Sequence, residues 1–139
     1  LIPNIILYLL GEKKEFNLYG TDFSTPDGTA VRDYIHVTDL ARAHVLALEK
    51  LPALSRSESI NLGTNQGHSI LDVIKKVESV SGQKIPYTAK PRRKGDVPVL
   101  LASKEKAEQL LGWKLKHSDL DTIIRTAWIW HQKMSENKI

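Results

Sequence analysis

The sequence predicts a mixed α/β domain, because helical and strand-like segments alternate along its 139 residues. Apolar residues make up 41% of the chain and charged residues 26%, a composition typical of a folded globular domain. In several segments apolar residues recur at helical spacing, and short branched or aromatic runs between turn signals are typical of strands. A chain of this length is enough for one compact domain, so we interpret residues 1–139 as a single unit.

The first third of the chain predicts one helix and two strands. Residues 1–10 are mostly apolar and precede Gly11, which favours a helix with a left-handed end. Residues 16–19 and 31–37 have the aromatic and branched character of strands. The segment between these strands contains Pro26-Asp27-Gly28, in which proline presets one dihedral angle and glycine allows the reversed one, so a turn is expected.

The middle of the chain predicts two helices with a buried strand between them. Asp39 is expected to cap a helix whose apolar positions follow helical spacing up to Leu51. Residues 60–62 have the apolar pattern of a strand. Ser69 is expected to cap the next helix, which ends before Gly82.

The last third predicts a strand over residues 85–88, a polar loop over 91–98 and a helix over 103–111. Ser118 and Asp121 resemble a capping box at the start of a final helix. That helix has apolar residues facing inward at positions 123, 124, 127 and 128.

Composition excludes several classes of site. The chain has no cysteine, which excludes disulfides and thiolate metal sites and suits a reducing compartment, so we expect a cytoplasmic protein. The sequence contains no glycine-rich dinucleotide or Walker loop, no nucleophile elbow and no His-Glu-x-x-His helix, and its histidines never take metal-ligand spacing. Residues 1–10 are too few to span a bilayer and lack the features of a signal peptide. We therefore expect no membrane segment and no catalytic apparatus.

The positive charge is mild and spread along the chain. The formal net charge is +4 and the sequence pI is about 9.3, without a long basic tract. No interleaved aromatic or glycine motif accompanies the basic residues, so we expect no nucleic-acid partner. A site for a doubly charged pyrophosphate explains the charge equally well.

Some conspicuous side chains are better explained by packing than by chemistry. His44 lies on the apolar side of its predicted helix, and Trp113, Trp128 and Trp130 have apolar neighbours. We interpret all four as core residues.

Two arginine contexts indicate a site for an anion. Arg32 lies beside an apolar strand, where a charge is costly unless paired, so it serves either a structural ion pair with a nearby aspartate or a ligand. The loop Arg92-Arg93-Lys94-Gly95-Asp96 places three cations next to a glycine that lets a ligand approach the backbone. Guanidinium groups match phosphate oxygens bidentately. Arg92 and Lys94 are interpreted as solvated surface residues.

The chain resembles the UDP-glucose 4-epimerases, which are members of the extended short-chain dehydrogenase/reductase group. The resemblance covers essentially all 139 residues, and its most specific part is residues 25–40, TPDGTAVRDYIHVTDL. The other matching runs follow in the family's order and spacing: NLGT at 61–64, PRRKGD at 91–96, LLGW at 110–113 and TAWIW at 126–130.

The resemblance implies the C-terminal, UDP-sugar-binding portion of such an enzyme, without its Rossmann half. The family interconverts UDP-glucose and UDP-galactose through a 4-keto intermediate, with NAD and a Tyr-x-x-x-Lys pair in an N-terminal domain. The sequence begins with Leu1 and its one methionine is Met134, so we expect a truncated chain that is inert alone. Such a chain is expected to expose apolar surface and self-associate. The complete enzyme is expected to be a homodimer through the part not present.

The resemblance also implies roles for particular residues. Arg32 and Arg93 match arginines that contact the diphosphate, and Leu1 matches a leucine whose backbone lies near the same group. Asp96 matches a carboxylate that holds a ribose hydroxyl. The uracil is covered by the strand that contains Asn17 and Tyr19, as implied by the same match.

Sugar specificity is expected to depend on Leu100, which occupies a position where a bulky side chain crowds the sugar pocket and a smaller one admits an N-acetyl group. Leucine is intermediate, which leaves UDP-N-acetylhexosamines and UDP-pentoses as alternative substrates. A further alternative, from a different class, is a nucleotide-binding module without chemistry.

Overall fold

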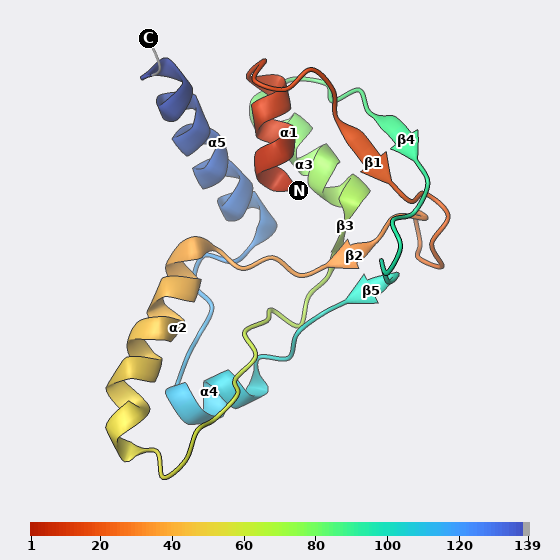
Figure 1. The fold of residues 1–139 in the computed structure, drawn as a ribbon. Coiled ribbons are helices and arrows are strands. Elements are labelled where there is room, and N and C mark those ends of the chain that lie inside the picture. The colour runs from red at the N-terminus through yellow and green to blue at the C-terminus, as the bar shows by residue number, and fades with distance from the viewer. Residues whose placement is uncertain (138–139) are drawn as a thin grey trace.

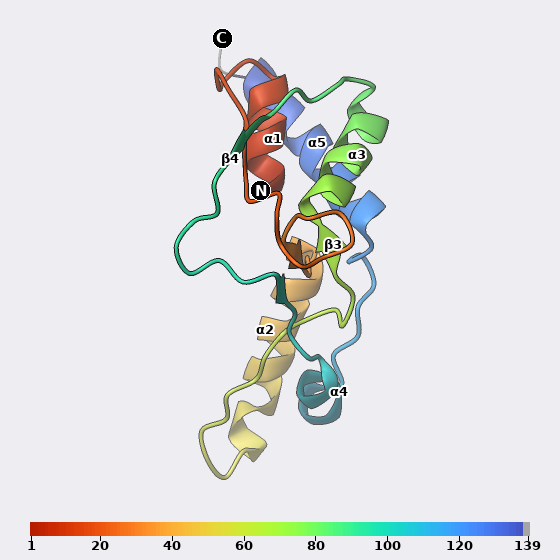
Figure 2. The same cartoon turned by 90° about the vertical axis from the view of Figure 1, so that its right-hand side faces the viewer.

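The computed structural model describes residues 1–137, which form a helical body and an arm (Figure 1). The body contains three helices and a pair of strands, whereas the arm contains two helices and a 3-10 turn. The arm extends away from the body in both views (Figures 1 and 2). A small three-stranded sheet lies where the two parts join. The elements are α1 (Ile2–Leu9), β1 (Asn17–Tyr19), β2 (Val31–Arg32), α2 (Val37–Lys50), a 3-10 turn (Leu51–Ala53), β3 (His68–Ser69), α3 (Ile70–Ser81), β4 (Thr88–Lys90), β5 (Val99–Leu100), α4 (Glu105–Leu111) and α5 (Leu120–Glu136).

The core of the body is formed by the apolar faces of α1, α3 and α5, which pack against one another. The helical spacing predicted all three helices, and the structure confirms them. Pro3 suits the first turn of α1, where its missing N–H has no helical partner to lose. The most deeply buried members of this core include Ile5, Ile6, Leu18, Val73, Val77 and Ile124.

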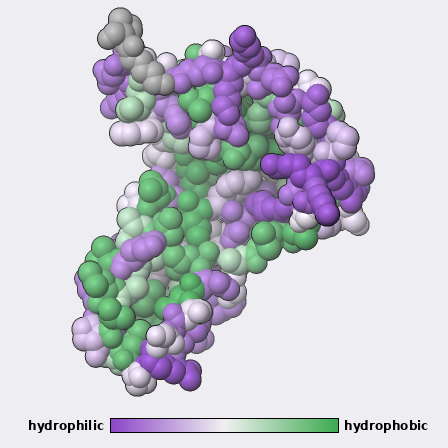
Figure 3. All heavy atoms as spheres, viewed as in Figure 1, coloured by the Kyte–Doolittle hydropathy of each residue, from purple (hydrophilic) through white to green (hydrophobic). Residues whose placement is uncertain are grey.

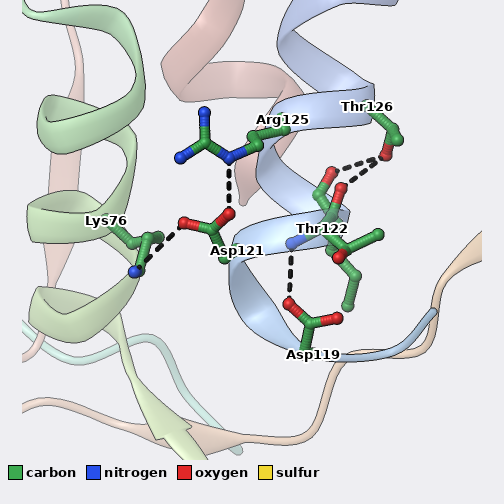
Figure 4. Close-up of polar contacts among 7 residues, drawn as sticks. Lys76, Asp119, Asp121, Thr122, Arg125 and Thr126 are labelled. Carbon is green, nitrogen blue, oxygen red and sulfur yellow. Dashed lines mark hydrogen bonds and ion pairs between the residues drawn. The ribbon is translucent and has the colours of Figure 1, made fainter. Parts of the chain in front are cut away.

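The caps of α3 and α5 differ in how well the sequence predicted them. Ser69 caps α3 in a capping box with Asp72, and Gly82 ends the helix in a left-handed conformation, as expected. The predicted capping box of Ser118 and Asp121 is wrong, because Asp119 is the N-cap of α5 and accepts from the backbone N–H of Thr122 (Figure 4). Asp121 instead bridges Lys76 of α3 and Arg125 of its own helix, at 3.3 and 2.5 Å.

The strand predicted over residues 85–88 begins later than expected. β4 covers Thr88–Lys90 and pairs in parallel with β1, with Asn17 opposite Thr88. All three β4 residues are exposed, while Ile85 is buried in the core of the body. The position of β4 is therefore set by its register with β1, a long-range contact that hydrophobicity does not reveal.

The strand predicted over residues 31–37 is mostly wrong, since β2 ends at Arg32. β2 is the central strand of the small sheet, antiparallel to β3 and parallel to β5. Each neighbour contributes only two residues, so no ladder partner continues beyond Arg32. The following residues turn into α2 instead, and β5 itself was not predicted.

The strand predicted over residues 60–62 is also wrong. In the described part of the chain no strand pairs with these residues, although Ile60 and Leu62 pack onto the core of the arm. That core is a small cluster in which Ala43 of α2 faces Ala107 and Leu111 of α4, beside the fully buried Trp113. The apolar pattern of residues 60–62 thus reflects packing on one side without hydrogen-bonded pairing.

Asp39 does not cap α2, contrary to the prediction, because the N-cap is His36. The Nδ1 atom of His36 accepts from the backbone N–H of Thr38, at 3.1 Å. Asp39 lies one turn further on, buried, where its carboxylate accepts from the backbone N–H groups of Lys116 and His117 and from the Ser118 hydroxyl. One side chain thus holds the connection between α4 and α5 against the first turn of α2.

Two of the expected core residues lie at the surface. His44 is exposed and hydrogen-bonds the carbonyl of Leu40, and Trp130 is 62% exposed, whereas Trp113 and Trp128 are buried as expected. Apolar side chains also gather over the outer side of α2 (Figure 3). We call this surface the outer face of α2, formed by Val37, Leu40, Val45, Leu48 and the adjoining Leu51. The expected exposure of apolar surface is therefore observed. Within residues 1–137, no helix is long and apolar enough to cross a membrane.

Replacing Asp39 by asparagine should destabilise the fold in a pH-dependent way. Burial alone would raise the pKa of this carboxyl, but the hydrogen bonds from Ser118, His117 and Lys116 outweigh burial and lower the pKa. A carboxyl whose pKa is lowered in the folded state stabilises the fold at pH values above its unfolded-state pKa of about 3.9. This stabilisation is lost as the pH falls through the folded-state pKa. We expect Asp39→Asn to cost about 2 kcal/mol at neutral pH.

This effect can be measured by urea unfolding at pH 7 and at an acidic pH below the unfolded-state pKa of Asp39. The difference in the free energy of unfolding between wild type and Asp39→Asn should become smaller in acid. Glu49→Gln, an exposed change on the same helix, should leave the free energy of unfolding unaltered at both pH values. A gap that stays constant with pH would contradict this account of Asp39.

Candidate binding site for an anionic ligand

A cavity of about 250 Å³ is lined by residues of β1, β2, the first turn of α1 and the loop that precedes β5. Both strands and the first turn of α1 contribute to its wall. The lining residues are Leu1, Asn4, Phe16, Asn17, Tyr19, Ala30, Arg32, Tyr34, Ile70, Arg93 and Asp96. All the site residues expected from the sequence, apart from Leu100, therefore come together here.

One side of the cavity is formed by Arg93, Tyr19 and Asp96. The guanidinium carbon of Arg93 lies 4.8 Å from the centre of the Tyr19 ring, a cation–π arrangement. Its Nε lies 3.3 Å from a carboxylate oxygen of Asp96, three residues further along the loop. Gly95, at a φ of 89°, permits the tight turn between these two residues. The stacking and the ion pair hold a cation at the cavity while its side chain stays 66% exposed.

Arg32 supplies a second cation from the floor of the cavity. It is half-buried, and its Nη1 donates to the carbonyl of the preceding Val31 at 2.7 Å. In the described residues no ion pair joins it to Asp33 or Asp39, the partners of the structural interpretation. Both carboxylates accept backbone N–H groups instead. Most donors of the Arg32 guanidinium thus remain available to a ligand.

Asn17, one of the lining residues, has a side-chain oxygen without a partner. The amide nitrogen of Asn17 donates to Glu15 at 2.9 Å, but its Oδ1 is buried and has no hydrogen-bond partner among the described residues. An unpaired buried acceptor is costly, so this side chain has an unmet hydrogen-bond requirement.

Sequence reasoning missed Tyr34 and Asn4 as lining residues. Tyr34 follows Arg32 by two residues, and side chains two apart in an extended segment share one face, which could have identified it. Asn4 lies three residues after Leu1, one turn along the helix. Burial raises the pKa of Tyr34, so its hydroxyl keeps its proton near neutral pH and can donate to an anion.

Leu100 and Arg92 lie outside the cavity. Leu100 is 59% exposed and pairs with Arg32 across the β2–β5 ladder, so it borders the site without lining it. The guanidinium of Arg92 stacks on Phe23, 4.3 Å from the ring centre, and its Nε donates to Asp22 at 2.7 Å. Arg92 is therefore engaged with the loop between β1 and β2 and is not simply solvated.

The electrostatic environment of the cavity favours an anion. Arg32 and Arg93 both line it, and no carboxylate among the described residues pairs with Arg32. In the described part of the chain no three His, Asp or Glu side chains converge in a way that could hold a metal ion. Two guanidinium groups, a tyrosine hydroxyl and an aromatic ring can instead bind a phosphate-bearing group with an attached ring.

Comparison with known proteins identifies the class. Residues 2–126 match the family model described as GDP-mannose 4,6 dehydratase. The chain therefore belongs to this family of nucleotide-sugar enzymes.

Within the family, the chain is similar to UDP-glucose 4-epimerases. It is 46% identical over 98% of its length to the UDP-glucose 4-epimerase of Lacticaseibacillus casei. It is also 47% identical over 96% of its length to a bifunctional UDP-glucose 4-epimerase and UDP-xylose 4-epimerase of Arabidopsis thaliana. A crystal structure of the Stenotrophomonas maltophila enzyme, with bound NAD and formylated UDP-arabinopyranose, aligns over 99% of the chain at 45% identity and a TM-score of 0.91.

The chain spans about two fifths of the length of these proteins. The shares covered are 41% of the L. casei protein, 38% of the A. thaliana protein and 40% of the S. maltophila chain. The mixed α/β fold is thus that of a portion of the epimerase fold.

Replacing Arg93 by glutamine should weaken the binding of inorganic pyrophosphate to the chain. We expect about a fivefold loss, or about 1 kcal/mol, the upper end for an exposed charge pair. Calorimetry at low ionic strength measures it. Lys94→Gln is the matched control, because it removes the same charge from the next residue, which does not line the cavity. Equal losses in both variants would indicate a general charge effect and contradict a specific site.

Proposed function

We propose that the chain is the C-terminal, substrate-binding portion of a UDP-glucose 4-epimerase and that residues 1–139 form its UDP-sugar-binding domain. The observation that carries this proposal is the convergence of Arg32 and Arg93 on one cavity without neutralisation of Arg32 by a carboxylate. A UDP-sugar carries about two negative charges on its diphosphate, which two guanidinium groups can match. The similarity to UDP-glucose 4-epimerases supports the choice of substrate.

Each lining residue has a role in this proposal. Arg32 and Arg93 bind the diphosphate, with the backbone of Leu1 beside it. Asp96, held by Arg93 at 3.3 Å, accepts from a ribose hydroxyl. Asn17 and Tyr19, which both line the cavity, cover the uracil.

The remaining walls of the site and the chemistry are assigned to another part of the protein. The cavity, at about 250 Å³, lies below the range of roughly 300–1,000 Å³ for small-molecule sites, so it encloses only part of a nucleotide sugar. The chain has no glycine-rich phosphate loop, and none of its residues is assigned to NAD. We place NAD and the catalytic base in a preceding domain, through which the complete enzyme would form a homodimer.

An apolar groove supports the presence of such a domain. It has a volume of about 650 Å³ and lies between α1, α5 and the start of α2. Trp130 and Val37, both well exposed, line it, and the outer face of α2 continues from Val37. Apolar surface of this kind is characteristic of regions that another domain or subunit covers.

One alternative is an epimerase of another UDP-sugar. The similarity to an enzyme that also acts on UDP-xylose favours UDP-pentoses as further substrates. Competition between UDP-glucose and UDP-xylose in the complete protein would decide this. A non-catalytic nucleotide-binding module is the remaining alternative, and a complete protein that binds UDP without any turnover would favour it.

Turnover measurements test the proposal directly. The isolated chain should bind UDP but leave UDP-galactose unchanged, while the complete protein should convert it to UDP-glucose. Chromatography of the nucleotide sugars measures conversion, and calorimetry measures binding. Absence of UDP binding, or conversion by the isolated chain, would contradict the proposal.

Sugar selectivity should respond to Leu100. In the complete enzyme, we expect Leu100→Tyr to lower turnover of UDP-N-acetylglucosamine relative to UDP-glucose by about tenfold, the scale of steric discrimination in a pocket. Val99→Tyr is a matched control, because side chains alternate along a strand and Val99 is similarly exposed at 51%. An unchanged ratio for Leu100→Tyr would exclude this role.

A further inference from the structure

Asp33 follows Arg32 directly and connects two segments that are distant in sequence. Its Oδ2 atom accepts from the backbone N–H of Thr64 at 3.2 Å and from that of Ala102 at 3.3 Å. Thr64 lies in the connection that leads to β3, and Ala102 follows β5. A single carboxylate oxygen therefore binds the segment before β3 and the segment after β5, the two strands that flank β2. It does so just beyond the last residue pair of the ladders.

The sheet needs this connection because its ladders are short. β2 has two residues, and each of its ladders ends at Arg32. The two flanking segments also contact each other, since a Cβ at Gly63 would lie only 1.8 Å from the carbonyl oxygen of Ala102. Only glycine permits this approach, and Asp33 then binds both segments through adjacent N–H groups.

We infer that Asp33 is a positioning residue that fixes the end of β2 and so sets the position of Arg32 in the cavity. The inference rests on the proposed function, in which Arg32 binds a diphosphate. Asp33 forms no ion pair with Arg32 in residues 1–137, and its accepting oxygen is engaged by the two N–H groups. Its contribution to binding is therefore geometric.

Charge and geometry have opposite effects at this position. A negative charge beside Arg32 opposes the binding of an anion, so removing it would strengthen binding if only the charge mattered. If Asp33 fixes the position of Arg32, its removal weakens binding despite the loss of a repulsive charge. The sign of the change in anion affinity on removing Asp33 therefore distinguishes a charge effect from a positioning effect.

The experiment compares UDP with uridine, which lacks the diphosphate, by calorimetry on wild type, Asp33→Ala and Asp33→Asn. For Asp33→Ala we expect UDP affinity to fall about tenfold and uridine affinity to change less than about twofold, where tenfold corresponds to about 1.4 kcal/mol. Asp33→Asn keeps an oxygen that can accept from both N–H groups but loses the charge. It should retain UDP affinity near wild type or above.

Two further variants separate positioning from general stability. Asp119→Ala removes the N-cap of α5, which lies outside the cavity, and should leave the ratio of UDP to uridine affinity unchanged (Figure 4). If Asp33→Ala fails to fold, Asp33→Glu replaces it. The glutamate keeps the charge but moves the oxygens by one methylene, so it should also weaken UDP binding.

Amide hydrogen exchange provides a measurement without ligand. Asp33→Ala should speed exchange at Thr64 and Ala102, and at Val31, whose N–H donates to Pro98, while Asp119→Ala should not. Unchanged exchange, or an Asp33→Ala variant with the wild-type affinity ratio, would overturn the inference while leaving the proposed function intact. A wild-type chain that binds no UDP would defeat the proposed function and the inference with it.

Discussion

Three aspartates, each six residues apart in the most distinctive run of the sequence, hold distant parts of this fold together. Each of Asp27, Asp33 and Asp39 accepts a hydrogen bond from a segment far along the chain, and Asp27 also accepts one from a neighbouring residue. Strands of two or three residues leave many backbone N–H groups without ladder partners, and such groups need acceptors when buried. Their donors are Thr29 and Ser69 for Asp27, Thr64 and Ala102 for Asp33, and Lys116, His117 and Ser118 for Asp39.

This use of carboxylates also determines the charge of the cavity. For Asp27 and Asp39, burial opposes ionisation, yet hydrogen bonds outweigh it and lower the pKa, so both stay charged near neutral pH. Because the carboxylates of residues 25–40 bind hydroxyl and backbone N–H groups, none of them neutralises Arg32. An arginine held without a carboxylate partner is suited to a phosphate. The residues that stabilise the fold thus also leave the site positive.

The helices were predictable because their signals are local. Apolar spacing identified α1, α3 and α5, and Ser69 with Gly82 correctly bounded α3. Where a cap was mistaken, the side chain had a long-range partner that local sequence does not reveal. Ser118 donates to Asp39, 79 residues away, and so Asp119 caps α5 instead. The arginine contexts alone indicated an anion site, but the other predicted site residues came only from the family resemblance. Tyr34 was missed although the strand expected over residues 31–37 places it on the same face as Arg32.

Strand errors had a different cause, and one of them carries information. β4 and β5 are set by pairing with β1 and β2, which no short window of sequence contains. Residues 60–62, by contrast, have a strand pattern but no strand partner within residues 1–137, and α2 is apolar on its outer face as well as at Ala43 on its inner face. The apolar side of residues 60–62 is thus satisfied by packing on the arm, whereas the outer face of α2 remains uncovered. That uncovered face supports the proposal that a further domain packs against this chain.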